Sequence, residues 1–189
     1  ARVVVTTGSS GGFILAFLSL FAPGDRVALA NPGYPPYRHI LSALGCEPVM
    51  LETGPETRWM PTEDQLRSCP ELLDGLLLAS PANPTGTMAD AVRIGALAAA
   101  CRARGAWLIS DEIYHGLTYA MPASTALAAW DDAIVINSFS KYFSMTGWRI
   151  GWMVVPERLV RPIERLAQNL YISPPAPSQV AALGAFDSL

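Results

Sequence analysis

The sequence contains little charge, few cysteines and few histidines, and each shortage excludes a class of function. Charged residues make up 15% of the 189 residues, and 13 Lys and Arg against 16 Asp and Glu leave a formal net charge of −3. No basic run or basic stripe is present, so nucleic acid is not expected as a partner. With His39 and His115 as its histidines, the sequence predicts no histidine-rich metal centre.

Long apolar runs and a leader pattern are also missing. The longest apolar runs, such as FILAFLSLFA, have about ten residues and are too short to cross a bilayer. The opening residues ARVVVTTGSSGG lack the charged, apolar and small-residue regions of a signal peptide. Cys46, Cys69 and Cys101 form no CxxC pair, which is typical of reduced thiols. We therefore expect a cytoplasmic protein without a membrane segment.

Apolar residues are plentiful, at 51% of the chain, which indicates a large α/β core. The length suits one sizeable domain. Both ends fall inside predicted elements, a strand at 2–6 and a helix at 178–189. We interpret residues 1–189 as one domain of a longer protein, truncated at both ends.

Strand patterns alternate with helix patterns along the chain. Strands alternating with helices favour a three-layer α/β/α fold, with a mostly parallel sheet covered on both faces. No internal repeat interrupts the alternation. Predicted strands cover 3–5, 27–30, 47–51, 75–79, 106–110, 133–137 and 150–155, and predicted helices cover 13–21, 37–44, a short segment opening at Thr62, 90–104, 157–170 and 178–189.

Polar clusters follow the predicted strands, each at the point where a strand has just ended. Sheets of this kind bind ligands beyond the carboxyl ends of their strands. The positions of these clusters therefore predict one shared active site. The clusters lie at 8–12, 31–37, 83–86, 111–114 and 138–141.

Lys141 is the first candidate for chemistry. A lone lysine after a strand is usually a solvated surface residue, but Lys141 has Ser, Tyr and Phe as neighbours rather than charges. A lysine held near apolar groups and another cation has a lowered pKa and becomes a nucleophilic amine. Arg149 is a candidate for that cation, and such an amine can form a Schiff base with an aldehyde.

Other clusters each allow a structural and a functional interpretation. Asp111 ends the strand AWLIS and is either a turn residue or a buried carboxylate that needs a cation, such as a protonated pyridine nitrogen. The segment 8–12 is either a flexible turn or an anion site formed by free N–H groups, hydroxyls and a helix N-terminus. Tyr34 is either a lid over a flat ring or a packed loop residue.

Taken together, three stretches resemble the pyridoxal-phosphate enzymes of fold type I, and more narrowly the class I/II aminotransferases. These stretches are SFSKYFSMTGWRIGW, NPTGT at 83–87 and SDEIYHGLTY at 110–119. Their order and spacing agree with that family. The resemblance covers essentially the whole chain, as the large domain that binds pyridoxal 5′-phosphate.

The resemblance also implies roles for individual residues. Lys141 would form a Schiff base with the cofactor aldehyde and, once substrate displaces it, move the proton between the substrate α-carbon and the cofactor. Asp111 would pair with the pyridine nitrogen and keep the ring an electron sink. Asn83 and Tyr114 would bind the phenolic oxygen, and Tyr34 would stack on the ring. The implied phosphate ligands are Ser9, Ser10, Ser138 and Arg149, with Ser140 assisting.

The implied activity is transfer of an amino group between an amino acid and a 2-oxo acid, by a homodimer. Family members also use an N-terminal segment and a C-terminal small domain with a substrate-binding arginine, and this chain contains neither. Three alternatives stay open. They are a carbon–sulfur lyase, cyclopropane-carboxylate synthase or decarboxylase with the same cofactor; the effector domain of a transcription regulator; and a fragment that is inert or only binds cofactor.

Overall fold

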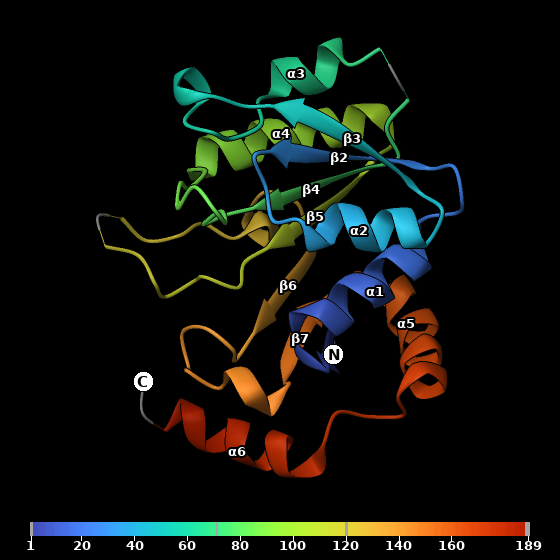
Figure 1. The fold of residues 1–189 in the computed structure, drawn as a ribbon, viewed down its shortest axis with the longest axis vertical. Helices are drawn as coiled ribbons and strands as arrows, with labels where there is room; N and C mark the ends of the chain where they lie inside the picture. The colour runs from blue at the N-terminus through green and yellow to red at the C-terminus, as the bar shows by residue number, and fades with distance from the viewer. Residues whose placement is uncertain (1, 71, 120, 188–189) are drawn as a thin grey trace.

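The computed structural model describes residues 2–70, 72–119 and 121–187. Within these residues, seven strands form one sheet in the order β1-β7-β6-β5-β4-β2-β3 (Figure 1). Helices cover both faces, which confirms the predicted α/β fold with three layers. No helix in the described part of the chain is long and apolar enough to span a membrane. The strands are β1 (Val3–Thr6), β2 (Arg26–Asn31), β3 (Glu47–Glu52), β4 (Gly75–Ala79), β5 (Trp107–Asp111), β6 (Ile134–Ser138) and β7 (Gly151–Val154).

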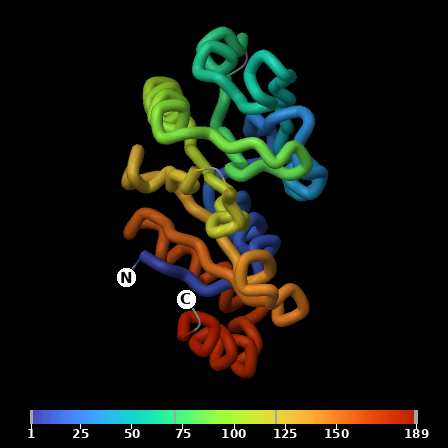
Figure 2. The backbone as a smooth tube through the Cα atoms, turned by 90° about the vertical axis from the view of Figure 1, so that its left-hand side faces the viewer, coloured from blue at the N-terminus to red at the C-terminus, as the bar shows by residue number. Residues whose placement is uncertain are grey.

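The sheet is mostly parallel, as predicted, with one reversal. The pairs β2–β3, β2–β4, β4–β5 and β5–β6 are parallel. Strand β7 runs antiparallel to both of its neighbours, β6 and β1. Figure 2 shows the N-terminal segment lying alongside β7, where Val4 pairs with Met153. Because β7 returns directly from β6, residues 139–150 form a loop at the carboxyl edge of the sheet.

The predicted helices agree with the structure to within one residue at most ends, and the last helix begins two residues earlier than predicted. Strand β4 and helix α5 have the predicted bounds, and Asp90 and Thr62 cap helices as expected of such side chains. Gly45 ends α2 with φ +80°, a conformation that suits glycine. The predicted end of the last helix at 188–189 lies outside the described residues. The helices are α1 (Gly8–Leu20), α2 (Pro36–Ala43), α3 (Glu63–Ser68), α4 (Ala91–Arg104), α5 (Glu157–Leu170) and α6 (Ala176–Phe186), and 3-10 turns occur at Pro55–Thr57, Ala126–Ala128 and Thr146–Trp148.

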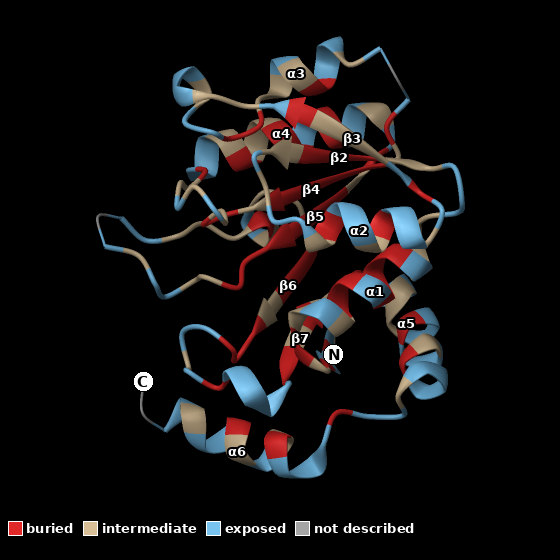
Figure 3. Ribbon diagram, viewed as in Figure 1, coloured by how far each residue is buried: buried red, intermediate tan, exposed pale blue. Residues whose placement is uncertain are grey.

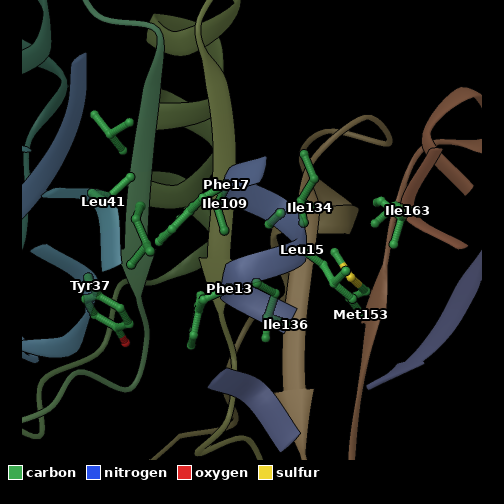
Figure 4. Packing of buried hydrophobic residues seen from close by; sticks show 14 of the residues in the cluster. Phe13, Leu15, Phe17, Tyr37, Leu41, Ile109, Ile134, Ile136, Met153 and Ile163 are labelled. Carbon is green, nitrogen blue, oxygen red and sulfur yellow. The ribbon is translucent and has the colours of Figure 1, made fainter. Parts of the chain in front are cut away.

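Two apolar cores lie on the two faces of the sheet. Helices α1, α2 and α5 pack on one face and helices α3 and α4 on the other, and the strands between them are largely buried (Figure 3). Successive strand residues alternate between the cores, as Leu76 and Leu77 do. In Figure 4, side chains of α1 lie against β5 and β6, and Phe17 of α1 lies beside Ile109 of β5, both 0% exposed. The central strands are thereby fixed from both sides.

The start of α1 corrects one prediction. The sequence predicts a turn at residues 8–12 before a helix starting at Phe13, but the helix already begins at Gly8. Glycine and serine have low helix propensity, yet tertiary packing overrides it here. A Cβ at Gly12 would lie 3.0 Å from Cγ2 of Ile136, so the missing side chain lets the helix approach β6 closely. Ser9 and Ser10 therefore stand in the first helical turn rather than in a loop.

Candidate functional site

A cavity of about 220 Å³ lies among the loops that follow the carboxyl ends of the strands. Nine of the ten residues predicted for the site line it, although they come from segments far apart in the sequence. Ser138 is the exception. The lining residues are Ser9, Ser10, Phe13, Tyr34, Tyr37, Asn83, Asp111, Ile113, Tyr114, Ser140, Lys141, Thr146 and Arg149.

Lys141 reaches the cavity from the loop at 139–150. Its side chain is exposed, and Nζ lies 5.7 Å from the centroid of the Tyr114 ring. The sequence carries a further signal that pattern analysis overlooked, because Lys141 is the only lysine among the 189 residues. The other twelve of the 13 Lys and Arg side chains are arginines, which cannot lose their proton in a protein. Lys141 is thus the one side-chain amine in the chain.

Asp111 is the buried charge of the site. It ends β5 with 5% exposure, accepts a hydrogen bond from the Tyr37 hydroxyl on Oδ2, and accepts another from the Ile113 N–H on Oδ1 at 3.1 Å. Burial raises the pKa of the carboxyl to about 6, while the hydrogen bonds from Tyr37 and Ile113 oppose that rise. A cation placed in the cavity beside this carboxylate would favour its charged form.

Tyr37 is the main residue that sequence analysis missed. It lies on α2 with 5% exposure, and its ring packs edge-on against Phe13 and Tyr34, with centroids 5.1 Å and 5.3 Å away. Burial, followed by the nearby Asp111 carboxylate, raises the pKa of Tyr37 well above its ordinary value, so the hydroxyl stays protonated and donates. The segment PPY contained a weak signal, since proline is common at the first position of a helix and Tyr37 directly follows Pro36.

At the other end of the cavity, a guanidinium meets a helix N-terminus. Arg149 has φ +50°, and its Nη1 donates to the Thr146 carbonyl at 2.7 Å. A Cβ at Gly8, which has φ +78°, would lie 2.4 Å from Nη2 of Arg149. Glycine at position 8 therefore permits the guanidinium of Arg149 to approach the start of α1 closely. The free N–H groups of the first turn of α1, with Ser9 and Ser10, add further donors for an anion.

The two serines before Lys141, Ser138 and Ser140, differ in position and in contacts. Ser138 is 1% exposed and its hydroxyl donates to the Ile150 carbonyl at 3.0 Å. It also accepts a hydrogen bond from the Ser140 N–H at 3.1 Å, and the two hydroxyl oxygens are 2.8 Å apart. Ser140 lines the cavity, whereas Ser138 lies beneath it and supports the loop. Thr146, which sequence analysis did not select, also lines the cavity and donates to the Ser140 carbonyl at 2.7 Å.

The remaining predicted residues complete the wall. Asn83 comes from the loop after β4 and Tyr114 from the loop after β5. Tyr34, from the loop after β2, is 38% exposed. The described residues contain no group of three His, Cys, Asp or Glu side chains that could hold a metal ion. The cavity therefore combines one amine, one buried carboxylate, one guanidinium and several hydroxyls.

Comparison with known proteins places the chain in a family. The chain matches the family described as "Aminotransferase class I and II" over residues 1–188. It is 54% identical over 187 residues to the valine–pyruvate aminotransferase of Mycobacterium tuberculosis, a match that covers 97% of this chain and 48% of that protein. It is 35% identical over 189 residues to the (5-formylfuran-3-yl)methyl phosphate transaminase of Methanocaldococcus jannaschii, covering 98% of this chain and 48% of that protein.

Solved structures have the same fold. A crystal structure of an aminotransferase from Mycobacterium tuberculosis superposes with a TM-score of 0.95 at 53% identity, covering 98% of this chain and 48% of that one. Aspartate aminotransferase from Thermus thermophilus with maleate superposes with a TM-score of 0.93 at 28% identity, covering 97% and 49%. The chain spans about half the length of the curated relatives it matches. Since the family match covers residues 1–188, the chain belongs to the aminotransferase class I and II family.

Proposed function

We propose that the complete protein containing this chain is a pyridoxal-phosphate-dependent aminotransferase, which transfers an amino group between an amino acid and a 2-oxo acid. The observation that carries the proposal is the composition of one cavity. The only lysine of the chain, a buried aspartate and an arginine at a helix N-terminus all line it. Residues 1–189 would be the large, cofactor-binding domain of a longer protein, which fits their share of the relatives' length.

The donor set at the arginine end fits a phosphate group. Ser9, Ser10, Ser140 and Thr146 supply hydroxyls, Arg149 supplies a charge-assisted donor, and α1 directs its N-terminus to the same place. Gly8 leaves room that any Cβ would fill, because such an atom would lie 2.4 Å from the guanidinium. Ser138 would act indirectly, by holding Ser140 in the wall.

The opposite end fits a protonated pyridine ring. Asp111 is a buried carboxylate whose raised pKa reflects burial, and a ring N–H⁺ would be the cation that stabilises its charged form. Asn83 and Tyr114 supply polar groups for the phenolic oxygen, and Tyr34 supplies an aromatic face at the mouth of the cavity. The residues present therefore suit pyridoxal phosphate at both ends.

Pyridoxal phosphate, when bound, supplies an aldehyde for amines and a ring that accepts electron density from the substrate carbon. Lys141 carries the amine that would bind this aldehyde and, once released by substrate, would take the proton from the substrate α-carbon. Asp111 would keep the ring nitrogen protonated. Tyr37 would keep Asp111 oriented through its hydroxyl. The serines and Arg149 would anchor the phosphate so that the amine and the reacting carbon stay aligned.

We further infer a homodimer in the cytoplasm. Exposed aromatic side chains occur beside the cavity, including Tyr34 at 38% and Trp148 at 47% exposure, and large exposed apolar groups are typical of interfaces. Cys46, Cys69 and Cys101 form no disulfide within the described residues, which suits a reducing compartment. Sedimentation of the complete protein tests the first inference, with twice the chain mass expected and the single chain mass contradicting it.

The experiment for the activity replaces Lys141 with alanine in the complete protein. Amino donors are paired with 2-oxo acids, beginning with valine and pyruvate because a relative 54% identical has that activity in its name. Wild-type protein should transfer the amino group, and the Lys141→Ala variant should not. Transfer that survives the substitution would refute the proposal. Release of ammonia and a 2-oxo acid without an acceptor would indicate a carbon–sulfur lyase instead.

A further inference from the structure

The ring of Tyr142 occupies the space that a side chain at position 116 would need. Gly116 has φ +91°, and a Cβ built on it would lie 2.4 Å from Cδ2 and 2.7 Å from Cε2 of Tyr142. Real Cβ atoms do not approach other heavy atoms this closely, and L side chains rarely adopt this φ. Glycine therefore suits position 116 for two reasons. It adopts this φ without strain, and its missing side chain leaves room for the Tyr142 ring.

This contact joins the two loops that carry the reactive groups. Gly116 follows Tyr114 in the loop after β5, and Tyr142 directly follows Lys141 in the loop between β6 and β7. Figure 1 shows both loops on the same side of the sheet. Across the described residues, no hydrogen bond or ion pair joins residues 112–119 to residues 139–149. The Tyr142 ring packed against Gly116 is thus a close contact between these two loops. It lies in the same loops as Lys141 and Tyr114, where Nζ of Lys141 is 5.7 Å from the centroid of the Tyr114 ring.

Tyr142 is itself held from behind by aromatic rings. Its ring lies edge-on to Phe143, with centroids 5.1 Å apart and an interplanar angle of 88°. Phe143 in turn lies 4.9 Å from Phe139, which is 5% exposed and lies 5.0 Å from Trp152 of β7. Tyr142 is 41% exposed, but this chain of rings connects it to the sheet and supports the ring on the side away from solvent.

We propose that Tyr142, seated on Gly116, is a positioning residue that holds the Lys141 amine over the Tyr114 ring. The proposal rests on the proposed function, since it concerns how fast that amine meets the cofactor aldehyde. Without the ring, the two loops can separate and Lys141 samples more directions. Small misplacements of a reacting group cost rate steeply. Tyr142 touches no reacting atom, so its removal should slow the chemistry of Lys141 without changing how substrate binds.

The test uses pyridoxal phosphate and borohydride on the complete protein, with mapping of the labelled peptide. Because Lys141 is the only lysine in these 189 residues, a label within them reports on one amine. Tyr142→Ala should slow labelling at Lys141 and lower kcat, both on the order of tenfold, with KM nearly unchanged. Tyr142→Phe keeps the ring and should restore both values. Tyr119→Ala is the matched control, because that side chain is 99% exposed.

A second pair of variants tests the shape match. Gly116→Ala should slow labelling as Tyr142→Ala does, and adding Tyr142→Ala to Gly116→Ala should not slow it further, because both changes remove the same contact. If Tyr142→Ala lowers the melting temperature, Tyr142→Leu is tested in place of Tyr142→Ala. Leucine keeps apolar burial without a flat ring, so this variant should slow labelling equally.

The outcomes separate this proposal from the proposed function. Labelling of wild-type protein at Lys141, with equal rates in Tyr142→Ala and Tyr119→Ala, would overturn the positioning role alone. Wild-type protein that takes no label at Lys141 would overturn the proposed function and this proposal with it. A slowed Tyr142→Ala variant that Tyr142→Phe does not rescue would also contradict the proposal, because the ring and not the hydroxyl contacts Gly116.

Discussion

The two ends of the cavity hold charge by different physical means. Asp111 is a carboxylate with 5% exposure, and its pKa is governed by burial and by donors from Tyr37 and Ile113. Arg149 is an exposed guanidinium beside the N-terminus of α1, where water can screen its charge. Changes at the buried end should therefore act through protonation and be large, and changes at the exposed end should act through affinity and depend on salt.

The largest effect is expected for Asp111→Asn. Breaking a buried charge pair by removing one partner costs about 3–5 kcal/mol, so transamination by the complete protein should fall by a factor on the order of 10² to 10⁴. Comparison of kcat/KM with wild-type protein measures it. Asp64→Asn, the same change at an exposed position on α3, should leave activity intact. Equal activity of the two variants would remove the distinction between the buried and exposed ends.

The second prediction concerns the pH dependence of the unfolding free energy of the protein without cofactor. The pKa of Asp111 in the folded protein, about 6, lies above its ordinary value of 3.8, so between these pH values the folded protein holds a proton that the unfolded chain has lost. The contribution of Asp111 to stability is therefore present at low pH and is lost as the pH rises through 6, by on the order of 3 kcal/mol. The difference in unfolding free energy between wild type and Asp111→Asn, followed from pH 4 to pH 7, measures it. A difference that grows in favour of wild type as pH rises would contradict the assignment.

Arg149→Ala should give a smaller effect at the exposed end. Hydrogen bonds to charged groups contribute about 1.5–3 kcal/mol, so affinity for pyridoxal phosphate should fall about 10- to 100-fold. Titration at low and high salt should show that wild-type affinity depends on salt more steeply than that of the variant. Arg161→Ala removes an exposed arginine on α5 that pairs with Glu164 and is the control. Equal losses in both variants would indicate a general charge effect instead.

The smallest expected effect is that of Tyr37→Phe. The change removes one donor to Asp111 and should lower the unfolding free energy at pH 7 by about 1 kcal/mol. Since the hydrogen bond from Tyr37 lowers the pKa of Asp111, its loss should move the pH-dependent loss of stability to higher pH. Unfolding of Tyr37→Phe over the same pH range tests this shift. An unchanged pH profile would mean that the hydrogen bond from Tyr37 does not influence the protonation of Asp111.

Strands and helices were predictable because their patterns are strong and local. Runs such as GLLLA, bounded by turn residues, indicate buried strands, and the bounds of β4 and α5 agree with the structure. Nine of the ten predicted site residues line one cavity because the carboxyl ends of neighbouring parallel strands meet at one edge. Those parts depend on short-range sequence and on a general rule of sheet topology.

The unpredicted parts depend on contacts between distant residues. The start of α1 at Gly8 follows from packing against β6, which outweighs the low helix propensity of glycine. Tyr37 contacts Asp111 across 74 positions of sequence, and neither local pattern points to the other. Ser138 and Ser140 look alike in the sequence, but only the fold determines which of them lies beneath the wall.

The single antiparallel strand, β7, has a consequence for tolerance to insertions. Because the chain turns back directly from β6, the lysine and the arginine of the cavity stand on one loop whose two ends are anchored by paired strands. An added residue in most surface loops would be absorbed by the loop itself. An added residue between Lys141 and Arg149 would instead change the span between amine and guanidinium. The length of this loop therefore sets the distance between the two groups that would bind the ligand. Variants with a longer or shorter loop should discriminate among ligands of different size.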